Sequence, residues 1–485
     1  MNEYITSDEM MVIDTNCEYH GLTRLQLMEN AGKSLAEEIA KRFDSGRIGI
    51  YAGLGNNGGD AFVAARHLNG YDRDYEIEIF LLGSSANIKT DIARRNFEIL
   101  KKSGFSIKEI RDSTMLEEDD FDVIIDGMLG TGVKGRLREP FARAVEIINS
   151  SNSYVVAVDV PTGLNPDTGE YVTAVKADLT VTFHKAKPGL VKPDVADVVG
   201  ELVVRDIGIP LVFEKLTGPG DVKKVYRRYP AGHKGNHGRV LIVGGGPYSG
   251  APALAAMAAY ATGADVVTVA VPEVIYDIVA SFSPNLIVRK LSGDMLGMKN
   301  LEGIRELAAK HHVVVMGMGA GRSEEVQEVA EEVLKLEEVK KAVLDADALL
   351  SSIPENVECI LTPHRAEFKR IFGFDAENED DVKKAAKKAN ATVLLKSQED
   401  MISDGERVRI NRTGNPGMTV GGTGDVLAGI AGAFLALSDP FWSASAAAFV
   451  NGVAGDLCME DLGFNFTAMD VVKKIPQAVR NALNF

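Results

Sequence analysis

The residues with the clearest chemical potential lie in 411–430, NRTGNPGMTVGGTGDVLAGI. Three glycines stand just before an apolar segment of helical length: Gly421, Gly422 and Gly424. The N–H groups of such a loop and the positive end of a helix dipole favour a phosphate or a developing oxyanion. Asp425 falls in the first helical turn, where it can take a proton from a hydroxyl that attacks a phosphoryl group. The alternative is a helix cap, in which Thr423 or Asp425 satisfies free N–H groups.

A second candidate site follows a short apolar strand expected at residues 47–52. Its glycine-rich loop leads into a helix and contains Asn56, Asn57, Gly58, Gly59 and Asp60. Strand, glycine loop and helix together form a phosphate-binding turn, but a dinucleotide-binding unit also needs an acid at the end of its second strand. The strand expected at 76–82 ends in Gly83 and Ser84. Chemistry other than hydride transfer is therefore indicated.

Acids end two further strands of the first half. The segments 121–126 (FDVIID) and 154–159 (YVVAVD) end in Asp126 and Asp159, and a strand at 179–183 precedes Lys187. In an open parallel sheet, the carboxyl ends of the strands line the ligand crevice, so these groups can share a pocket with the glycine loop. The alternatives are an aspartate that caps the next helix and a solvated loop lysine.

The second half also alternates buried strands with helical segments. Strands are expected at 239–243, 266–271, 312–316, 342–344, 359–361 and 392–395, followed by a hairpin at 401–410 around Asp404-Gly405. Glycine or polar residues follow most of these strands, among them Asp345, His364 and Lys396. This pattern predicts a ligand-binding α/β domain. Alone, His364 would be read as a cap or surface residue and Lys396 as a salt-bridge partner.

Length and composition predict a two-domain protein that acts on small molecules. A chain of 485 residues exceeds one hydrophobic core, and the lapse in periodicity at 205–230 places the boundary between domains 1–218 and 219–485. The net charge of −16 argues against nonspecific binding to nucleic acid or anionic membranes. Three widely separated cysteines form neither a disulfide framework nor a zinc site, which fits the cytoplasm, and no membrane span is expected.

Four motifs in the first half together resemble the YjeF N-terminal family, the NAD(P)H-hydrate epimerases: GNNGGDAFVAARHL, IDGMLGTGVKGR, DVPTG and TFHKAKPGL. The resemblance covers most of residues 1–215 and implies a Rossmann-like α/β sandwich. It implies that Asp159 is the acid/base group and that the hydrated dinucleotide contacts Asn56, Asn57, Gly58, Gly59, Asp60, Gly130, Thr131, Gly132, Val133, Lys134, Gly135, Arg136 and Asp159. It also implies potassium ligands at Asn57, Asp126 and Thr162. Thr162 stands where serine is common, and Ala61 where glycine is common.

The second half resembles the ribokinase-like superfamily, specifically the NAD(P)H-hydrate dehydratases. The motifs are GHKGNHGRVLIVGGG with YSGA, GMGAG, TPHRAEF, LLKSQED and GNPGMTVGGTGDVLAG, over about residues 225–485. The resemblance implies a ribokinase-like α/β domain whose substrate contacts are Ala251, Gly319, His364 and Asp425. It implies nucleotide contacts at Lys396, Ser397, Gln398, Glu399, Asp400 and Gly424. Two departures from the family pattern are Arg365-Ala366 after His364 and Ser397 after Lys396.

The two resemblances predict one repair pathway for NADHX and NADPHX, the forms of NADH and NADPH hydrated at C6 of the nicotinamide ring. One domain would interconvert the two epimers, and the other would dehydrate the S epimer with ADP and Mg²⁺, releasing AMP and phosphate. The choice of ADP over ATP follows from the resemblance alone. The apolar positions of the N-terminal helices predict a homo-oligomer. The rival functions are a small-molecule kinase and a noncatalytic scaffold.

Overall fold

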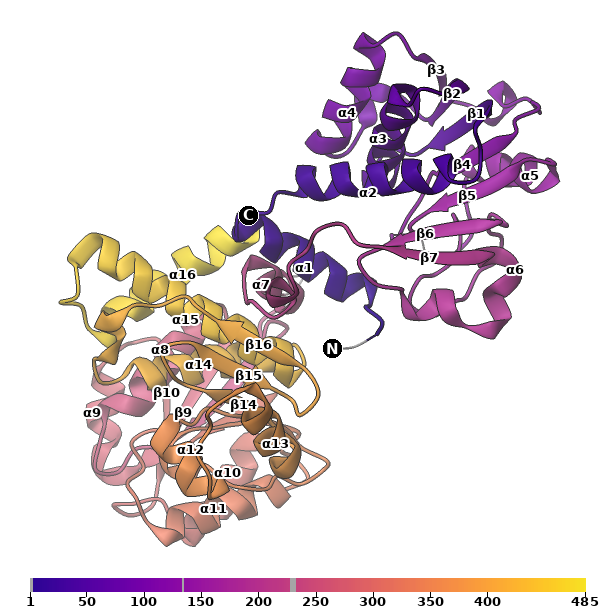
Figure 1. The fold of residues 1–485 in the computed structure, drawn as a ribbon. Coiled ribbons are helices and arrows are strands. Elements are labelled where there is room, and N and C mark those ends of the chain that lie inside the picture. The colour runs from indigo at the N-terminus through magenta and orange to yellow at the C-terminus, as the bar shows by residue number, and fades with distance from the viewer. Residues whose placement is uncertain (1–2, 133–134, 227–232) are drawn as a thin grey trace. The chain divides into compact units, whose positions relative to one another are not determined.

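The computed structural model describes residues 3–132, 135–226 and 233–485 of the chain (Figure 1). Two compact units make up the protein, Met1–Glu214 and Lys215–Phe485. The division falls between Glu214 and Lys215, whereas the sequence places it after residue 218. Each unit contains one sheet with helices, so the two-domain α/β prediction is confirmed.

The sheet of the first unit consists of β1 (Ser45–Ala52), β2 (Asp74–Leu82), β3 (Ser106–Ile110), β4 (Val123–Gly127), β5 (Tyr154–Val158), β6 (Leu179–Phe183) and β7 (Glu201–Arg205). The strands are parallel and run in the order β3-β2-β1-β4-β5-β6-β7. Strands β2 and β3 lie on one side of β1, and β4 lies on its other side, followed by β5, β6 and β7. The order therefore reverses between β1 and β4, where open α/β sheets form their ligand crevice.

Helices cover both faces of this sheet: α1 (Ser7–Tyr19), α2 (Arg24–Ala40), α3 (Asn56–Gly70), α4 (Asp91–Lys102), α5 (Phe141–Ser150) and the short α6 (Ala196–Val199). Residues of α1 to α4 share one core cluster with the strands, whereas α5 belongs to a cluster on the other face. In α4, Ala93, Phe97 and Leu100 recur at helical spacing and are buried, which gives the helix one apolar face. The predicted pair of helices before the first strand is confirmed, and each begins with a threonine capping box.

The sheet of the second unit consists of β8 (Arg239–Val243), β9 (Val266–Pro272), β10 (Ile287–Leu291), β11 (Val313–Met316), β12 (Lys341–Leu344), β13 (Glu358–Leu361), β14 (Thr392–Leu395), β15 (Asp400–Ser403) and β16 (Val408–Asn411). Their order is β10-β9-β8-β11-β12-β13-β14-β15-β16. Strands β8 to β14 are parallel, and β15 and β16 add the predicted antiparallel hairpin. The order reverses between β8 and β11, which places a second ligand crevice there.

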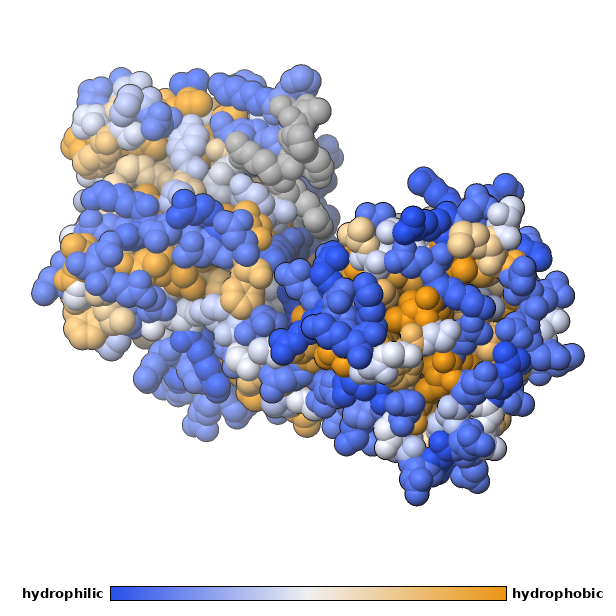
Figure 2. All heavy atoms as spheres, turned by 90° about the horizontal axis from the view of Figure 1, so that it is seen from above, coloured by the Kyte–Doolittle hydropathy of each residue, from blue (hydrophilic) through white to orange (hydrophobic). Residues whose placement is uncertain are grey.

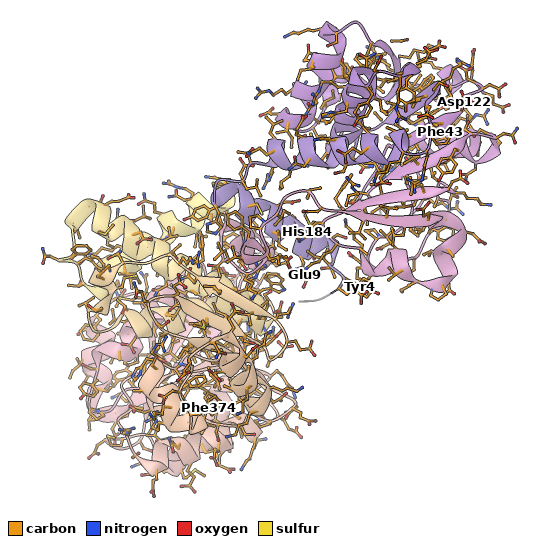
Figure 3. The ribbon with its side chains drawn as sticks, in the orientation of Figure 1. Tyr4, Glu9, Phe43, Asp122, His184 and Phe374 are labelled. Carbon is orange, nitrogen blue, oxygen red and sulfur yellow. The ribbon has the colours of Figure 1, made fainter. Side chains whose placement is uncertain are left out.

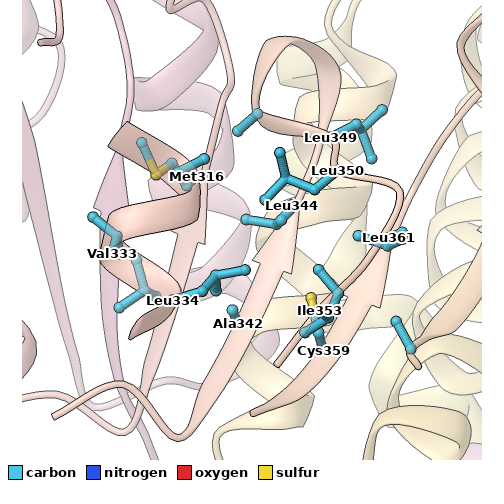
Figure 4. Close-up of a cluster of buried hydrophobic side chains, with 14 of the residues drawn as sticks. Met316, Val333, Leu334, Ala342, Leu344, Leu349, Leu350, Ile353, Cys359 and Leu361 are labelled. Carbon is cyan, nitrogen blue, oxygen red and sulfur yellow. The ribbon is translucent and has the colours of Figure 1, made fainter. Parts of the chain in front are cut away.

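The helices of this unit are α7 (Pro219–Val225), α8 (Gly250–Thr262), α9 (Tyr276–Ser281), α10 (Leu301–Ala308), α11 (Glu324–Lys335), α12 (Arg365–Phe372), α13 (Glu379–Ala389), α14 (Thr423–Leu435), α15 (Pro440–Leu462) and α16 (Ala468–Asn484). Figure 4 shows part of the core between the strands and α11, where Met316 and Leu344 lie near Val333. Helices α8 and α14 approach so closely that a Cβ on Gly429 would lie 2.1 Å from the Ala255 carbonyl oxygen. Small residues therefore let α8 and α14 pack closely against each other.

The segment around the predicted boundary is structured within the second unit. The Thr217 N–H donates to the Ile410 carbonyl oxygen (3.0 Å), and the Ile410 N–H donates to that of Lys215 (2.7 Å). Buried Asp221 of α7 lies 3.5 Å from the Arg409 guanidinium. These contacts correct the expectation of an irregular linker over 205–230, because its described middle part pairs with a strand and forms a helix.

The surface is mainly polar, with smaller apolar patches on the face that Figure 2 shows. Within residues 3–132, 135–226 and 233–485, the structure contains no helix that is long and apolar enough to cross a membrane.

Candidate active sites

The glycine loop before α14 leaves the start of that helix without a side-chain cap. Gly422 is the N-cap residue, with φ of 100°, and no side chain accepts a hydrogen bond from the first turn. The Thr423 hydroxyl instead donates to the Met418 carbonyl oxygen at 2.9 Å. The helix-cap interpretation of Thr423 and Asp425 is therefore wrong. The positive end of the α14 dipole faces the loop that contains Gly421 and Gly422, and Gly424 lies in the first turn of the helix.

A pocket of about 600 Å³ opens at this helix start. Three predicted substrate contacts line it together: Ala251, Gly319 and Asp425. The remaining lining residues are Pro247, Tyr248, Ser249, Gly250, Leu254, Asp347, Gly421 and Gly422. The sequence gives no role to Tyr248 or Asp347, although Asp347 follows a strand end as the other candidates do. The pocket thus combines an anion-binding helix start with two carboxyl groups.

Asp425 has a carboxyl group suited to proton transfer. Burial, followed by the nearby Asp345 carboxylate, raises the pKa of Asp425 to about 7, while the Lys396 ammonium opposes that rise. Near neutral pH, a carboxyl group with this pKa is protonated in some molecules and ionised in others, which suits general acid–base catalysis.

Asp345 and Lys396 form a largely buried ion pair near Asp425. Lys396 Nζ lies 2.8 Å from Asp345 Oδ1, and the Thr362 hydroxyl donates to the same oxygen at 2.8 Å. Only 3% of the Asp345 side chain is exposed. The position of Asp345 directly after β12 is the sequence signal for this residue, but its pairing with Lys396 depends on the tertiary fold.

His364 uses its ring as the cap of α12. Its Nδ1 accepts hydrogen bonds from the N–H groups of Ala366 (3.1 Å) and Glu367 (3.2 Å). Its side chain is 54% exposed, and it does not line the pocket described above. The Lys396 N–H donates to the Pro363 carbonyl oxygen at 2.8 Å, which places the His364 backbone beside that lysine. The ring of His364 therefore caps a helix, which is one of the two roles that the sequence suggests when this residue is considered alone.

The departure after His364 has a local explanation. The Arg365 guanidinium donates to the Ala376 carbonyl oxygen at 2.9 Å, which ties the start of α12 to the segment that follows it.

The predicted nucleotide loop is held by its own hydrogen bonds. The Ser397 N–H donates to Asp400 Oδ1, and Asn411 Nδ2 donates to Asp400 Oδ2, both at 3.0 Å. Burial raises the pKa of Asp400 to about 6. Gln398 and Glu399 are exposed, and Glu399 lies 2.9 Å from Arg412 Nε.

Gly424 lies directly over the lysine of this loop. A Cβ on Gly424 would be 3.4 Å from Lys396 Nζ. The helix start and the nucleotide loop are therefore adjacent.

In the first unit, Asp126 and Thr162 are joined by a buried hydrogen-bond network. The Thr162 hydroxyl donates to Asp126 Oδ1 and its N–H donates to Oδ2, both at 2.7 Å, while the Met128 N–H donates to Oδ1 at 3.2 Å. Burial raises the pKa of Asp126 to about 6, and the hydrogen bonds oppose that rise. Over the described ranges, no basic side chain forms an ion pair with this carboxyl group. A small cation would offset its buried charge.

Asn57 lies beside the same network with an unused polar atom. Its Nδ2 is buried and has no hydrogen-bond partner among the residues that the structure describes, and its Oδ1 would be 3.3 Å from a Cβ on Gly130. Within the part of the chain that the structure describes, no cluster of three or more His, Cys, Asp or Glu side chains could hold a metal. A potassium ion requires a different set, because amide, hydroxyl and carboxylate oxygens are its hard ligands.

The loop of Asn56 to Asp60 forms the first turn of α3. The Thr90 hydroxyl donates to Asn56 Oδ1 at 2.7 Å. A Cβ on Gly58 would be 2.1 Å from the Gly53 carbonyl oxygen, and a Cβ on Gly59 would be 2.5 Å from Met28 Cε. Glycine at these two positions lets α3 begin immediately beside the strand exit.

Asp159 directly follows β5 in the left-handed region, with φ of 62°. Its Oδ1 accepts hydrogen bonds from the Thr182 hydroxyl (2.9 Å) and the Phe183 N–H (3.2 Å), and forms an ion pair with Lys187. The Lys187 side chain is 1% exposed and that of Asp159 is 17% exposed. The buried Lys187 ammonium thus pairs with a carboxylate that stays partly accessible, so Lys187 is not the solvated loop lysine that the sequence leaves open.

The remaining predicted contacts belong to the loop after β4. Thr131, Gly132, Gly135 and Arg136 are exposed. Gly135 has φ of 82°, and a Cβ on Gly132 would have no atom within 4 Å. Val133 and Lys134 lie outside the described residues.

Known proteins resemble the chain along its whole length. Family models match residues 24–189 (YjeF-related protein N-terminus) and residues 240–477 (NAD(P)H-hydrate dehydratase). The bifunctional NAD(P)H-hydrate repair enzyme Nnr of Archaeoglobus fulgidus is 59% identical over 483 residues, covering 100% of both chains. The protein of that name from Methanothermobacter thermautotrophicus is 48% identical over 492 residues, covering 97% of this chain and 94% of its own.

A solved structure resembles part of the chain. The ADP/ATP-dependent NAD(P)H-hydrate dehydratase from Bacillus subtilis, co-crystallised with ATP and Mg²⁺, is 23% identical and has a TM-score of 0.47. The match covers 54% of this chain and 97% of that one. With relatives of this similarity spanning its full length, the chain belongs to the family of the bifunctional NAD(P)H-hydrate repair enzyme Nnr.

Proposed function

We propose that the protein repairs NADHX and NADPHX, with epimerisation in the first unit and ADP-dependent dehydration of the S epimer in the second. The observation that carries the proposal is Asp425 in the first turn of α14, with its pKa near 7 and a pocket at its side. A proton acceptor beside an anion-binding helix start fits the phosphorylation of a substrate hydroxyl.

In the dehydratase reaction, Asp425 takes the proton of the C6 hydroxyl, and the hydroxyl oxygen attacks the terminal phosphorus of ADP. AMP leaves with the electron pair of the broken P–O bond. The ring nitrogen then supplies electrons to C6, phosphate leaves with the C6–O electron pair, and loss of the C5 proton restores NAD(P)H. The N–H groups at the start of α14 stabilise the charge that develops on the transferred phosphoryl group.

Nucleotide binding is assigned to the surface formed by Gly424 and the loop Lys396–Asp400. Support comes from the closeness of Gly424 to Lys396 Nζ, which puts a positive charge at the helix start. Asp347 and Asp425 line one pocket and offer the carboxylate oxygens that suit Mg²⁺. When bound, Mg²⁺ would neutralise phosphate charge.

In the epimerase site, Asp159 exchanges protons with the substrate while its ion pair with Lys187 holds the carboxylate in place. Asn57, Asp126 and Thr162 would hold potassium, which would supply positive charge for orienting substrate oxygen atoms. The donor set fits this ion, since the Asp126 carboxylate is buried and Asn57 Oδ1 lies near Gly130. Asn56 to Asp60 and the loop Gly130–Arg136 contact the dinucleotide in this proposal.

The experiment follows absorbance at the reduced-nicotinamide band after the purified protein is mixed with both NADHX epimers, K⁺, Mg²⁺ and either ADP or ATP. Complete recovery with release of AMP and phosphate from ADP supports both activities. A small-molecule kinase is the second candidate, because a glycine loop with an aspartate serves any hydroxyl phosphorylation. Phosphorylation of a vitamin precursor without recovery of NADH would favour the kinase. The homo-oligomer and the cytoplasmic location stay predictions, and light scattering tests the first.

A further inference from the structure

The N-terminal helix α1 is fixed against the segment that carries Lys187. Tyr4 pairs with Ala186 as an isolated bridge, and the Ile5 N–H donates to the Ala186 carbonyl oxygen at 3.0 Å. The Ser7 N–H and hydroxyl both donate to the Asp167 carboxylate, at 2.8 and 2.7 Å. Figure 3 labels Tyr4 and His184 at this junction of the N-terminal segment with the end of β6. The N-terminal end of α1 is thereby held beside Ala186, which directly precedes Lys187 in the sequence.

This placement brings Asp14 of α1 into a group of three carboxyl groups around one ammonium. Asp14 and Asp60 both interact electrostatically with Asp159 and Lys187, and Asp60 interacts with Asp14 as well. Lys187 is covered, whereas each carboxyl side chain keeps part of its surface exposed. The group joins three separate parts of the unit: α1, the first turn of α3 and the exits of β5 and β6.

The three carboxyl groups lie in different electrostatic environments. Asp159 is ion-paired with Lys187, but one ammonium cannot neutralise three carboxylates that share a site. Burial raises the pKa of Asp14 to about 6 and that of Asp60 well above its usual value, and the Asp159 charge raises both further. Lys187 opposes both rises, and Arg24 opposes that of Asp14. When the environments of neighbouring carboxyl groups push their pKa values apart, one group can donate a proton while another accepts one.

An independent observation marks this place as a ligand site. Asn57 precedes Asp60 by three residues on α3, so the two side chains share a helix face. The buried Asn57 Nδ2 has no hydrogen-bond partner among residues 3–132, 135–226 and 233–485. A buried polar group of this kind is normally satisfied by a ligand or water.

Interconversion of the C6 epimers requires both a donor and an acceptor of protons. In one route the C6–O bond breaks with its electron pair, the leaving hydroxyl takes a proton and departs as water, and the N1 lone pair forms N1=C6. Water then adds to the opposite face and gives up a proton. In the ring-opening route the hydroxyl gives up its proton to form an aldehyde, and N1 gains one as the C6–N1 bond breaks. Neither route needs an oxidant or a reductant.

We propose that Asp14 is a second proton-transfer residue of the epimerase site, supplying the proton while Asp159, paired with Lys187, accepts one. The assignment rests on the proposed epimerase function. This role is separate from those that the sequence motifs imply, because Asp14 lies on α1, before the first strand, and belongs to none of those motifs.

The test compares the wild-type bifunctional protein with D14N, D14E and the control D8N, which makes the same charge change at an exposed position of the same helix. Purified R-epimer is supplied, and its conversion to the S epimer is followed by chromatography without ADP. Loss of a general acid typically lowers a rate about 10²- to 10⁴-fold. We expect kcat of D14N to fall by about that factor with KM little changed, D14E to recover part of the rate, and D8N to behave as wild type.

Dehydration of the S epimer by the second unit of the same molecule is the internal control for folding, together with thermal unfolding. Unchanged epimerisation in D14N overturns the proposal. An equal loss in D14N and D14E, or a loss confined to KM, assigns Asp14 a structural or binding role and also overturns it. If the wild-type protein itself does not convert the R epimer, the proposed epimerase function fails.

Discussion

Lys396 Nζ lies 2.8 Å from Asp345 Oδ1, and both groups act on the pKa of Asp425 in opposite directions. Asp345 raises the pKa of Asp425, whereas Lys396 lowers it. Burial is the main cause of the raised pKa of Asp425, and the ion pair modifies the pH at which this proposed base of the dehydratase becomes ionised. Two predictions follow from this relationship, one for the base and one for the pair.

Replacing the base should stop dehydration and leave epimerisation intact. In D425N the C6 hydroxyl has no proton acceptor, so the rate of NADH recovery from the S epimer should fall by about 10²- to 10⁴-fold. The wild-type rate should rise as pH increases through about 7, because Asp425 acts when ionised. Stopped recovery with normal R-to-S conversion is the expected assay result. A D425N protein that retains ADP-dependent recovery would remove Asp425 from the mechanism.

Breaking the ion pair from either side should move the pH profile in opposite directions. D345N removes the carboxylate that raises the pKa of Asp425, so the rising limb should shift to lower pH. K396M removes the ammonium that lowers that pKa, so the limb should shift to higher pH. Both variants lose the same buried ion pair, and with it part of the folding stability of the protein. Each variant is therefore a control for the other. Shifts of the same sign, measured as kcat/KM against pH, would contradict the assignment.

The strands inside both sheets are largely predictable from the sequence. Strands β6, β8 and β14 coincide with the predicted ranges because interior strands are buried on both faces and consist mostly of apolar or β-branched residues. The sequence does not predict β3, β7 or β10. All three lie at sheet edges, and β3, SIKEI, mixes exposed and half-covered positions without an apolar run. The edge strand β16 is predictable only because Asp404-Gly405 marks its hairpin.

The site residues divide in a similar way. The sequence singles out Asp126 at the end of β4, and Asp159, Lys396 and Asp425 directly after strands or a glycine loop, as candidates. Asp14 gives no such signal, since its relation to Lys187 arises from the packing of α1 on a segment far along the chain. For His364, the motif implies a substrate contact, but in the structure its ring caps α12.

Alanine at Gly421 and at Gly422 should have different effects. A Cβ on Gly421 would have no atom within 4 Å, so G421A should fold normally and weaken ligand binding by narrowing the pocket. Gly422 has φ of 100°, and its Cβ would lie 2.7 Å from Leu254 Cδ1. G422A should therefore lose about 1–3 kcal/mol of stability. Thermal unfolding and nucleotide titration distinguish the two, and equal unfolding temperatures for both variants would contradict the loop geometry.

The Thr162 hydroxyl should be required both for the Asp126 network and for the effect of potassium. T162V leaves the buried Asp126 carboxyl short of one donor, at a cost of about 1–3 kcal/mol. T162S keeps the hydroxyl and loses only a methyl group, worth about 1 kcal/mol when buried. R-to-S conversion is measured while KCl replaces choline chloride at constant ionic strength. Wild type and T162S should be activated by K⁺, and T162V should lose most of that response. Equal activation in all three proteins would remove Thr162 from the cation site, whereas activation by choline alone would show a general salt effect.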